Sequence, residues 1–423
     1  MKITDRIKTK LIYPYAYLII SLKSFLAFLS QILKKDKVIF EQPYSGENIA
    51  ILALYNKGKL RADIKNLLTV LKNNGAYVIA INTLKLKDDE LDNHIDCYIE
   101  RPNYGRDFGS YKAGFKHFYR NGWHKDCKRL LMLNDSLFYS NKNLDSLINV
   151  SLNSSREVLA ATENYEIEHH LGSFFISFSK DILQKNIFRS FWKKYKNSDV
   201  RPKVIKKGEM GLTKVLKKSV SNEFQLKANF DISWFAQAVN SNEDFIIKNF
   251  NRLVRTSGRH VATVDVWPTP SMKSVLERVF DTYIAQNPAH DLKEINLDIK
   301  KLSLFDLTNL ESTIEGLTKE LVTANKELLN KLFRAELKNE LRETFMVGSH
   351  IHQSGLLMHA LGVPLIKLDG LYRGTFSMQD INSFTKQLEA PEIEGFQEIL
   401  YKRPYGGEFL EGWKLAAFLR GLL

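Results

Sequence analysis

The chain has 423 residues, 44% of them hydrophobic and 11% aromatic, which is enough for a buried core and for two or three domains. This composition excludes a disordered, collagen-like or disulfide-scaffold protein, and the two cysteines, Cys97 and Cys127, indicate a reducing compartment without a zinc cage. The net charge of +13 favours a phosphorylated small molecule or an acidic membrane surface over nucleic acid, because no RNA-binding aromatic motif, zinc-finger spacing or long basic tract is present.

An apolar helix is predicted near the N-terminus, over residues 11–35, LIYPYAYLIISLKSFLAFLSQILKK. Its apolar side chains share one face and its polar ones another: Leu18, Leu22, Phe25, Leu29 and Ile32 against Lys23, Ser30 and Lys34. Lys23 near the centre argues against a membrane span, and the flanking tyrosines and lysines favour a helix lying in the membrane interface. The alternatives are a buried helix and a true span. A signal peptide is not expected, because no small-residue cleavage site follows.

Alternating strands and helices are predicted next. Short apolar runs indicate strands at 48–56, 76–83, 95–103 and 129–136, followed by a fifth and a sixth at 158–167 and 172–179. Helical spacing indicates helices at 61–75 and 109–122, each ending at a glycine. This order predicts an α/β, Rossmann-type domain with a mostly parallel central sheet.

The second half is predicted to be mainly helical and basic. After residue 180 come two basic helical segments and a strand-like patch at 221–230. Long helical patterns occupy 270–345 and favour a helical insert that packs on the domain. A short apolar helix is expected at 407–423. The expected domains are an amphipathic helix over 1–40, a catalytic domain over 45–265, a helical insert over 266–347, and a C-terminal helical region over 348–423 that completes the catalytic domain.

Polar residues follow four of the predicted strands. They are Tyr55-Asn56, Asn82-Thr83, the loop at 102–112 and Asn134-Asp135-Ser136. Because ligands of open α/β sheets bind beyond the carboxyl ends of the strands, we expect these turns to border one site.

The loop at 102–112 is a predicted diphosphate site. Its candidate ligands are Asn103, Gly105, Arg106, Asp107, Gly109 and Lys112. Glycines let backbone N–H groups approach a phosphate, the following helix presents its positive end, and Arg106 and Lys112 supply charge. Asp107 is expected to pair with Arg106 or to brace the turn.

Asp135 is a candidate ligand of Mg²⁺ or Mn²⁺. It ends the apolar run Leu130–Leu133 and stands between Asn134 and Ser136. A carboxylate in this position suits a hard cation shared with substrate phosphates. Ordinary turn and helix-capping chemistry is the alternative.

Several motifs together resemble the rhamnan synthesis protein F family, bacterial polysaccharide glycosyltransferases related to the GT-A superfamily. They are N-x-G-R-D-F-G-x-Y from Asn103, L-N-D-S from Leu133, H-L-x-S-F-F from His170, E-M-G-L-T from Glu209, and a segment from His352 to Lys367. The resemblance covers roughly 48–250 and resumes near 348–375.

The resemblance implies a GT-A-like nucleotide-sugar fold with Asn134-Asp135-Ser136 where related enzymes carry Asp-x-Asp. Only one acid of that triplet is present, which weakens the metal site. The four strand-end residues Tyr55, Asn56, Asn82 and Thr83 would face the base and the ribose. Glu209 is the nearest counterpart of an acidic catalytic base, although Met210 replaces the second acid of that motif.

Other residues are candidates for related roles. Glu163, Glu166 and Glu168 are alternatives to Glu209 as the base. His170 would bind a phosphate or the acceptor, or else complete a strand end. His352, Lys367 and Arg373 would add diphosphate contacts, although packing and surface charge is the favoured explanation for these three.

The expected function is therefore inverting transfer of a sugar, L-rhamnose or another deoxyhexose, from a nucleotide-diphosphate donor such as dTDP-L-rhamnose. The expected acceptor is a lipid-linked glycan of a cell-surface polysaccharide (rhamnan, O-antigen of lipopolysaccharide, or capsule). We expect a peripheral protein at the cytoplasmic face of the bacterial inner membrane, on an anionic surface. The alternative is a non-catalytic scaffold of the same assembly machinery.

Overall fold

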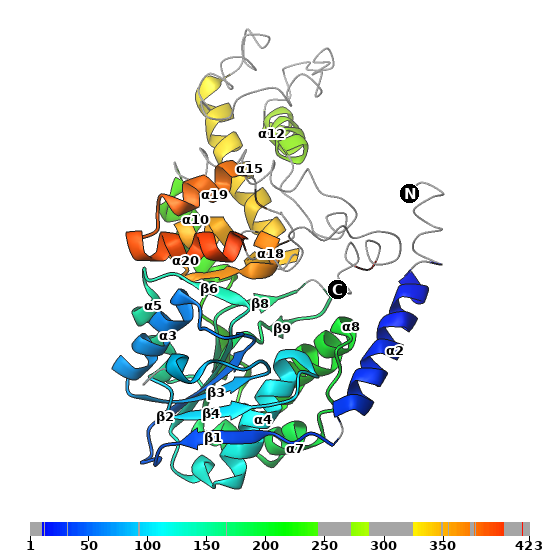
Figure 1. Cartoon of the computed structure of the whole chain (residues 1–423). Helices are drawn as coiled ribbons and strands as arrows, with labels where there is room; N and C mark the ends of the chain where they lie inside the picture. The colour runs from blue at the N-terminus through cyan, green and yellow to red at the C-terminus, as the bar shows by residue number, and fades with distance from the viewer. Residues whose placement is uncertain are drawn as a thin grey trace.

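A computed structural model of the chain describes residues 11, 13–31, 33–91, 94–165, 167–243, 272–286, 325–347, 350–353, 355–372, 376, 378–401 and 417. Its centre is an eight-stranded sheet in the order β1-β4-β3-β2-β5-β10-β7-β11. Figure 1 labels four of its strands, β1 to β4. In that order the strands are Lys37–Glu41, Cys97–Glu100, Ala76–Asn82, Asn48–Leu54, Arg129–Asn134, Phe175–Ser179, Val158–Ala160 and Leu226–Ala228.

The middle of this sheet is parallel. Strands β4, β3, β2 and β5 run in the same direction, as do β7 and β11. The edge strand β1 is antiparallel to β4, and β10 is antiparallel to both of its neighbours. The predicted α/β fold with a mostly parallel sheet is confirmed, and the carboxyl ends of its four central strands lie along one edge.

Helices cover both faces of the sheet because alternate strand residues point to opposite sides. On one face, Leu52 and Val78 pack against α3 (Ala62–Asn73) and α5 (Leu144–Leu152). On the other face, Ile51 and Ile79 pack against α4, α7 and α9. These helices are Arg106–Arg120, Asn186–Lys194 and Met210–Ser219, and α6 (Lys180–Gln184) lies beside them.

The C-terminal region adds a second, two-stranded sheet. Strand β12 (Leu365–Lys367) pairs antiparallel with β6 (Leu137–Tyr139), and Lys367 lies opposite Leu137. The helices around it are α16 (His350–Gln353), α17 (Gly355–Ala360), α18 (Leu368–Tyr372), α19 (Met378–Thr385) and α20 (Ala390–Tyr401). Phe138 packs with Phe384 and Phe396 of these helices, so this region is joined to the strand that follows Asp135.

Two helices of the expected insert are described, α12 (Met272–Gln286) and α15 (Lys326–Val347). Arg278 of α12 forms ion pairs with Glu336 and Glu340 of α15 at 2.7 and 2.8 Å. Phe345 of α15 stacks on Phe235 of α10 (Ile232–Ser241), with ring centroids 4.0 Å apart. The expected helix at 407–423 lies outside the described residues except for Ala417.

Short elements complete the fold. They are β8 (Glu163–Asn164), β9 (His170–Leu171), α8 (Arg201–Val204), a π-helical turn at Ile205–Glu209, and 3₁₀ turns at Asp88–Glu90, Trp123–Lys125 and Glu223–Gln225. At the other end of the chain, α2 (Tyr13–Gln31) is the one helix among the described residues that is long and apolar enough to cross a membrane.

The predicted loop at 102–112 is too long. Helix α4 already begins at Arg106, so Gly109 and Lys112 are helical residues. Gly105 has φ +95°, a left-handed conformation that glycine adopts easily, and it turns the chain into the helix at that point. The connection from β4 to α4 is therefore residues 101–105.

Candidate functional site

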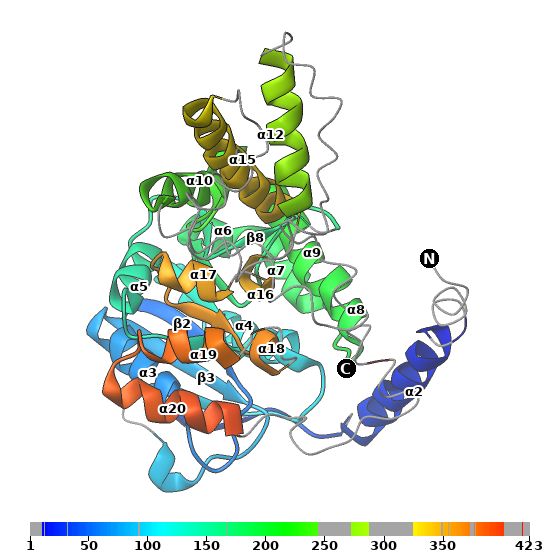
Figure 2. The same cartoon turned by 90° about the horizontal axis from the view of Figure 1, so that it is seen from above.

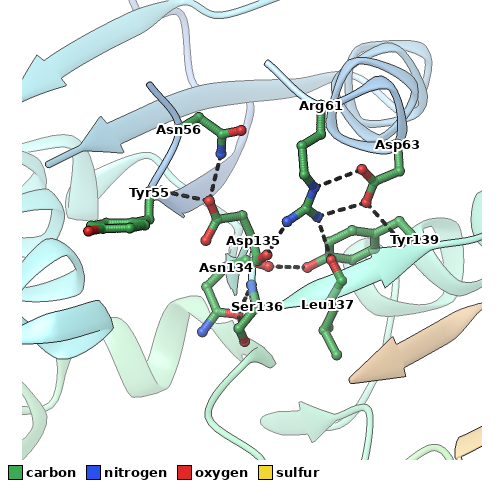
Figure 3. A network of polar contacts seen from close by, with 9 residues as sticks. All are labelled: Tyr55, Asn56, Arg61, Asp63, Asn134, Asp135, Ser136, Leu137 and Tyr139. Atoms are coloured by element: carbon green, nitrogen blue, oxygen red, sulfur yellow. Dashed lines mark hydrogen bonds and ion pairs between the residues drawn. The ribbon is translucent and has the colours of Figure 1, made fainter. Parts of the chain in front are cut away.

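Asp135 lies at the centre of the edge formed by the parallel strands. Its Oδ2 accepts hydrogen bonds of 2.6 Å from the backbone N–H of Tyr55 and from the side-chain amide of Asn56 (Figure 3). Both donors follow β2, the strand next to β5. The structure therefore brings together the polar turns after β2 and β5, as the strand order predicts.

Asn82, at the end of β3, has a bracing role. It is fully buried, its amide donates to the carbonyl of Asn56 at 2.8 Å, and its oxygen accepts from the Asn56 N–H at 3.2 Å. A contact between Asn82 and a nucleotide is therefore not available in this conformation. Nearby, Tyr55 is 62% exposed and the Thr83 hydroxyl is buried without a hydrogen-bond partner among the described residues.

Arg61 fixes the turn that carries Asp135. Its guanidinium donates to the carbonyls of Asp135 and Leu137, each at 2.6 Å, and forms a bidentate ion pair with Asp63 (Figure 3). Asp63 also accepts from the backbone N–H of Tyr139. This arginine lies before α3, outside every sequence motif named above, so no sequence signal singled it out.

Burial controls the protonation of Asp135. The carboxyl is 9% exposed, and loss of solvation raises its pKa to about 6, although Arg61 and the Tyr55 N–H favour the charged form. Asp107 and Asp63 raise the pKa further through charge repulsion. Asp135 is therefore a carboxyl group that titrates within about two pH units of neutrality.

A chain of hydrogen bonds leads from α4 to β12 through the Asn-Asp-Ser triplet. Asn134 donates to the Asp107 carboxylate at 2.8 Å and accepts from the Ser136 hydroxyl. That hydroxyl accepts from the Lys367 ammonium at 2.7 Å. Asp107 thus braces the triplet, and Lys367, 231 residues further along the chain than Ser136, places a cation beside it.

The side chain of Lys367 is partly buried. Its Nζ lies 4.5 Å from the centre of the Phe174 ring, and burial lowers its pKa, while Asp107, Glu209 and Asp369 favour the charged form. An ammonium group placed in this way is a point charge for an anionic ligand, and its partial burial reduces the screening by water. Sequence analysis favoured packing or surface charge for Lys367, and its spacing alone gave no sign of this position.

Glu209 interacts electrostatically with Lys367, the cation beside the triplet. It is the last residue of the π-helical turn, and such turns are frequent at functional sites. Burial raises its pKa, against the opposing effects of His170 and Lys367. The Nε2 atom of His170 is 3.9 Å from its carboxylate, and His170 Nδ1 donates to the carbonyl of Glu168 at 2.7 Å.

The segments that carry Glu209 and His170 are held together. Thr213 of α9 accepts the Leu171 N–H at 3.1 Å, and Gly208 lies against the ring of Phe108 in α4, where a Cβ would be 3.0 Å away. The E-M-G-L-T and H-L-x-S-F-F motifs therefore meet in space, next to the start of α4.

The glycines near the start of α4 are required by packing. A Cβ on Gly105 would lie 2.7 Å from the Cβ of Asn197, and one on Gly109 would lie 2.4 Å from the Arg101 guanidinium. The Gly105 N–H donates to Asp199 at 2.7 Å, and the Gly109 N–H donates to the Gly105 carbonyl. Both N–H groups that were predicted to cradle a diphosphate are thus engaged within the protein.

The remaining loop candidates differ in exposure. Asn103 and Arg106 are exposed, and Arg106 adopts a left-handed φ of +51°. Lys112 donates to the carbonyl of Tyr195, on the side of α4 that faces α7. Arg106 is accordingly the loop cation nearest to solvent, while Lys112 is engaged away from the triplet.

Two of the alternative bases form ion pairs with other side chains. Glu163 pairs with His169 at 3.0 Å, and Glu168 pairs with Lys214 at 2.8 Å.

His352, a candidate for diphosphate contacts, lies 3.8 Å from Asp369, which follows β12 and pairs with Arg201 at 3.1 Å. Glu166 and Arg373 lie outside the described residues.

The donor set around Asp135 fits a divalent metal poorly. One carboxylate oxygen already accepts two hydrogen bonds, and the Asn134 oxygen accepts two from Ser136. The Ser136 hydroxyl is occupied by the Lys367 ammonium. The triplet leaves one carboxylate oxygen, and the neighbouring cation is a lysine, whereas Mg²⁺ and Mn²⁺ prefer several oxygen ligands.

A separate group of potential metal ligands, Glu41, Cys97 and His117, lies at the opposite edge of the sheet, where β4 begins. Both ring nitrogens of His117 already contact other side chains: the Arg120 guanidinium lies 3.3 Å from Nδ1, and Nε2 lies 3.0 Å from the Asn121 side-chain amide and beside the Glu41 carboxylate. This group fits a hydrogen-bonded pair better than a metal site.

Comparison with known proteins agrees with the family predicted from the motifs. Residues 77–262 match the sequence model of the family described as Rhamnan synthesis protein F, and this confirms the predicted resemblance. The chain is 28% identical over 180 residues to the uncharacterized protein y4gN of Sinorhizobium fredii (strain NBRC 101917 / NGR234), covering 41% of this chain and 46% of that protein. It is 29% identical over 126 residues to Virulence protein VirA of Vibrio anguillarum (strain ATCC 68554 / 775), covering 29% and 39%.

The chain spans less than half the length of these curated relatives. Among solved structures, the crystal structure of the glycosyltransferase GlyE in Streptococcus pneumoniae TIGR4 is similar at 15% identity and a TM-score of 0.26, covering 48% of this chain and 51% of that one.

Proposed function

We propose, from the match of residues 77–262 to the model of the rhamnan synthesis protein F family, that this protein is a glycosyltransferase of polysaccharide synthesis. The observation that carries the proposal is the convergence of Asp135, Glu209 and Lys367 at the carboxyl edge of a parallel sheet, where α/β proteins bind nucleotides. The donor is a nucleotide-diphosphate sugar, with L-rhamnose or another deoxyhexose as the sugar. The acceptor is a lipid-linked glycan.

Inverting transfer requires a base and a cationic environment for the leaving group. The acceptor hydroxyl oxygen bonds to C1 of the sugar while the C1–O bond to the diphosphate breaks, and the electron pair leaves on the diphosphate. Glu209 takes the hydroxyl proton, and burial raises the pKa of its carboxyl, which makes the carboxylate a stronger base than an ordinary surface glutamate.

Lys367 supplies the positive charge for the leaving diphosphate, with Arg106 as a second, exposed cation at the start of α4. A fixed charge beside the developing anion lowers the barrier because it needs no rearrangement during the reaction. This assignment differs from the metal predicted at Asp135. The hydrogen bonds of Asp135 give it a positioning role, since it joins the turns after β2 and β5.

A thermal-shift titration of the purified chain with dTDP, UDP, GDP and CMP tests the proposal. One nucleotide, dTDP for a rhamnose donor, is expected to stabilise the protein in EDTA as well as in Mn²⁺, by about 2.7 kcal/mol at a hundredfold excess over its dissociation constant. A folded sample that responds to none of the four would instead support the non-catalytic scaffold.

A further inference from the structure

Helix α2 is docked on the protein by one narrow face. Ala16, Ile20 and Ser24, spaced four residues apart, are its buried residues. Ala16 and Ile20 pack against Val200, next to α8, and against Ala417. The opposite side of the helix makes no part of this cluster.

The docking contacts run along the whole helix. Near its start, the Lys203 ammonium lies 5.5 Å from the centre of the Tyr17 ring. In the second half, the Ser24 hydroxyl accepts the Asp199 N–H at 3.2 Å, and the Phe28 ring lies 5.8 Å from that of Tyr104. Helix α2 therefore lies along the flank of the domain, and both views show it at the outside of the molecule (Figures 1 and 2).

The outward face of α2 is apolar. Four of the five residues predicted to share a face, Leu18, Leu22, Phe25 and Leu29, are between 47% and 57% exposed, and Leu26 is 63% exposed. The fifth, Ile32, lies outside the described residues. At 3.6 residues per turn these positions lie opposite Ala16, Ile20 and Ser24. A surface helix of a water-soluble domain instead turns its apolar face toward the core, because burial of that face holds the helix in place.

Positive charge adjoins this face. Lys34, Lys35 and Lys37 are exposed directly after the helix, and Lys23 is exposed at the border of the apolar stripe. A long lysine side chain at such a border keeps its ammonium group at the level of the lipid headgroups while its methylene stem contacts apolar surface. An apolar face with lysines at its edge and end is complementary to a bilayer that carries anionic headgroups.

We infer that the outward face of α2 binds an anionic lipid surface, with the helix axis parallel to the bilayer. A perpendicular span would carry Asp199, Val200 and Lys203, which contact α2 along its length, into the hydrocarbon. The inference does not rest on the proposed glycosyl transfer. Where both hold, the site lies beside the membrane, because Asp199 links Ser24 to the Gly105 N–H at the start of α4.

Flotation of the full chain with lipid vesicles tests this inference. Binding is expected to vesicles of phosphatidylcholine with 30% phosphatidylglycerol, to weaken as NaCl is raised because salt screens the lysines, and to be weak on phosphatidylcholine alone. The double variant Leu22→Glu/Phe25→Glu is expected to lose about tenfold or more of its partition. The matched control, Val150→Glu/Phe224→Glu, alters two apolar residues exposed elsewhere and should bind as the unmodified chain does.

Three results would overturn the inference. The first is equal vesicle binding by both double variants, provided that each unfolds at the temperature of the unmodified chain. The second is a concentration-dependent dimer that the α2 variant abolishes, which would assign the face to a second copy. The third is retention of the protein in cell membranes after alkaline carbonate extraction, which would indicate a span.

Discussion

Asp135 shows how two opposing effects set the state of one side chain. Two hydrogen bonds and a nearby arginine favour its carboxylate, yet desolvation is the larger effect and raises its pKa to about 6. Burial likewise raises the pKa of Glu209. Both carboxyl groups therefore bind protons more tightly in the folded protein than ordinary surface carboxylates do.

The raised pKa of Asp135 predicts a specific dependence of stability on pH. Between about pH 4 and 6 the folded chain holds a proton that the unfolded chain has lost, so the free energy of unfolding falls as pH rises through this window. For a pKa of about 6, the loss between pH 5 and pH 8 is about 1.4 kcal/mol.

Asp135→Asn should remove this component. Denaturant unfolding of both proteins at pH 5 and pH 8 measures it, and comparing the two pH values cancels any constant cost of the substitution. Parallel pH dependence in the two proteins would show that the carboxyl does not titrate in this way.

Glu209→Gln should separate binding from chemistry. The amide keeps the shape of the side chain but cannot accept the acceptor proton, so kcat should fall by about 10²- to 10⁴-fold. The dissociation constant of the donor nucleotide, measured by calorimetry, should change little, because Glu209 acts on the acceptor. Glu168→Gln alters an exposed acid that pairs with Lys214 and is the control. Transfer at the unmodified rate in Glu209→Gln would remove Glu209 as the base.

At the scale of elements, the start of α4 decides which groups reach the site. Gly105 turns the chain into the helix, Asp199 accepts its N–H, and Asp107 in the first turn accepts from Asn134. One hydrogen bond thus connects Asp107, in the first turn of α4, to Asn134 at the end of β5. The glycines at the start of α4 are needed because neighbouring residues pack too closely there for a Cβ atom.

Gly105→Ala should destabilise the fold by about 2–4 kcal/mol, because a left-handed alanine costs about 1 kcal/mol and overpacking adds about 1–3 more. Its Cβ would meet that of Asn197 at 2.7 Å. Gly75→Ala is the matched control, since Gly75 also has a left-handed φ, of +71°, and no atom within 4 Å of its added Cβ. Denaturant unfolding of Gly75→Ala should show a loss of about 1 kcal/mol in the free energy of unfolding, the cost of the left-handed alanine alone. Asn197→Gly combined with Gly105→Ala should recover part of the loss, and no recovery would point away from the clash.

At the scale of the whole molecule, the site is assembled from distant parts of the chain. Tyr55 and Asn56 follow β2, Asp107 begins α4, and Lys367 ends β12, which pairs with the strand directly after Asp135. The C-terminal region therefore contributes a cation to an edge built by the first half of the sequence.

Lys367→Met should weaken binding of the donor nucleoside diphosphate by about tenfold to a hundredfold, the range expected for loss of one charge-assisted hydrogen bond. Lys367→Arg should retain more affinity, because it keeps the charge. Calorimetry in EDTA measures both, and Lys214→Met, at an exposed lysine, is the control. Unchanged affinity in Lys367→Met, or binding that requires Mn²⁺, would contradict this role of Lys367. It would indicate that a metal ion neutralises the leaving diphosphate instead.

The sequence by itself determined the element types and the edge that carries the site. Apolar runs of strand length, helical spacing and glycines at helix ends are local signals, and they located β2, β3, β5, α3 and α4 within a few residues. Because parallel strands end at one edge, Asp135 and Asn56 could be expected near each other, and the apolar face of α2 followed from periodicity alone.

Only the tertiary structure decided which polar groups form hydrogen bonds within the protein and are therefore not available to a ligand. Asn82, Gly105 and Lys112 carry suitable chemistry, but their partners come from other segments, so no local pattern shows that they are engaged. Arg61 and Lys367 reach the triplet through long-range packing, which short motifs do not encode. Periodicity likewise cannot tell an apolar face that is buried from one that stays exposed, and the docking of α2 by Ala16, Ile20 and Ser24 settles this.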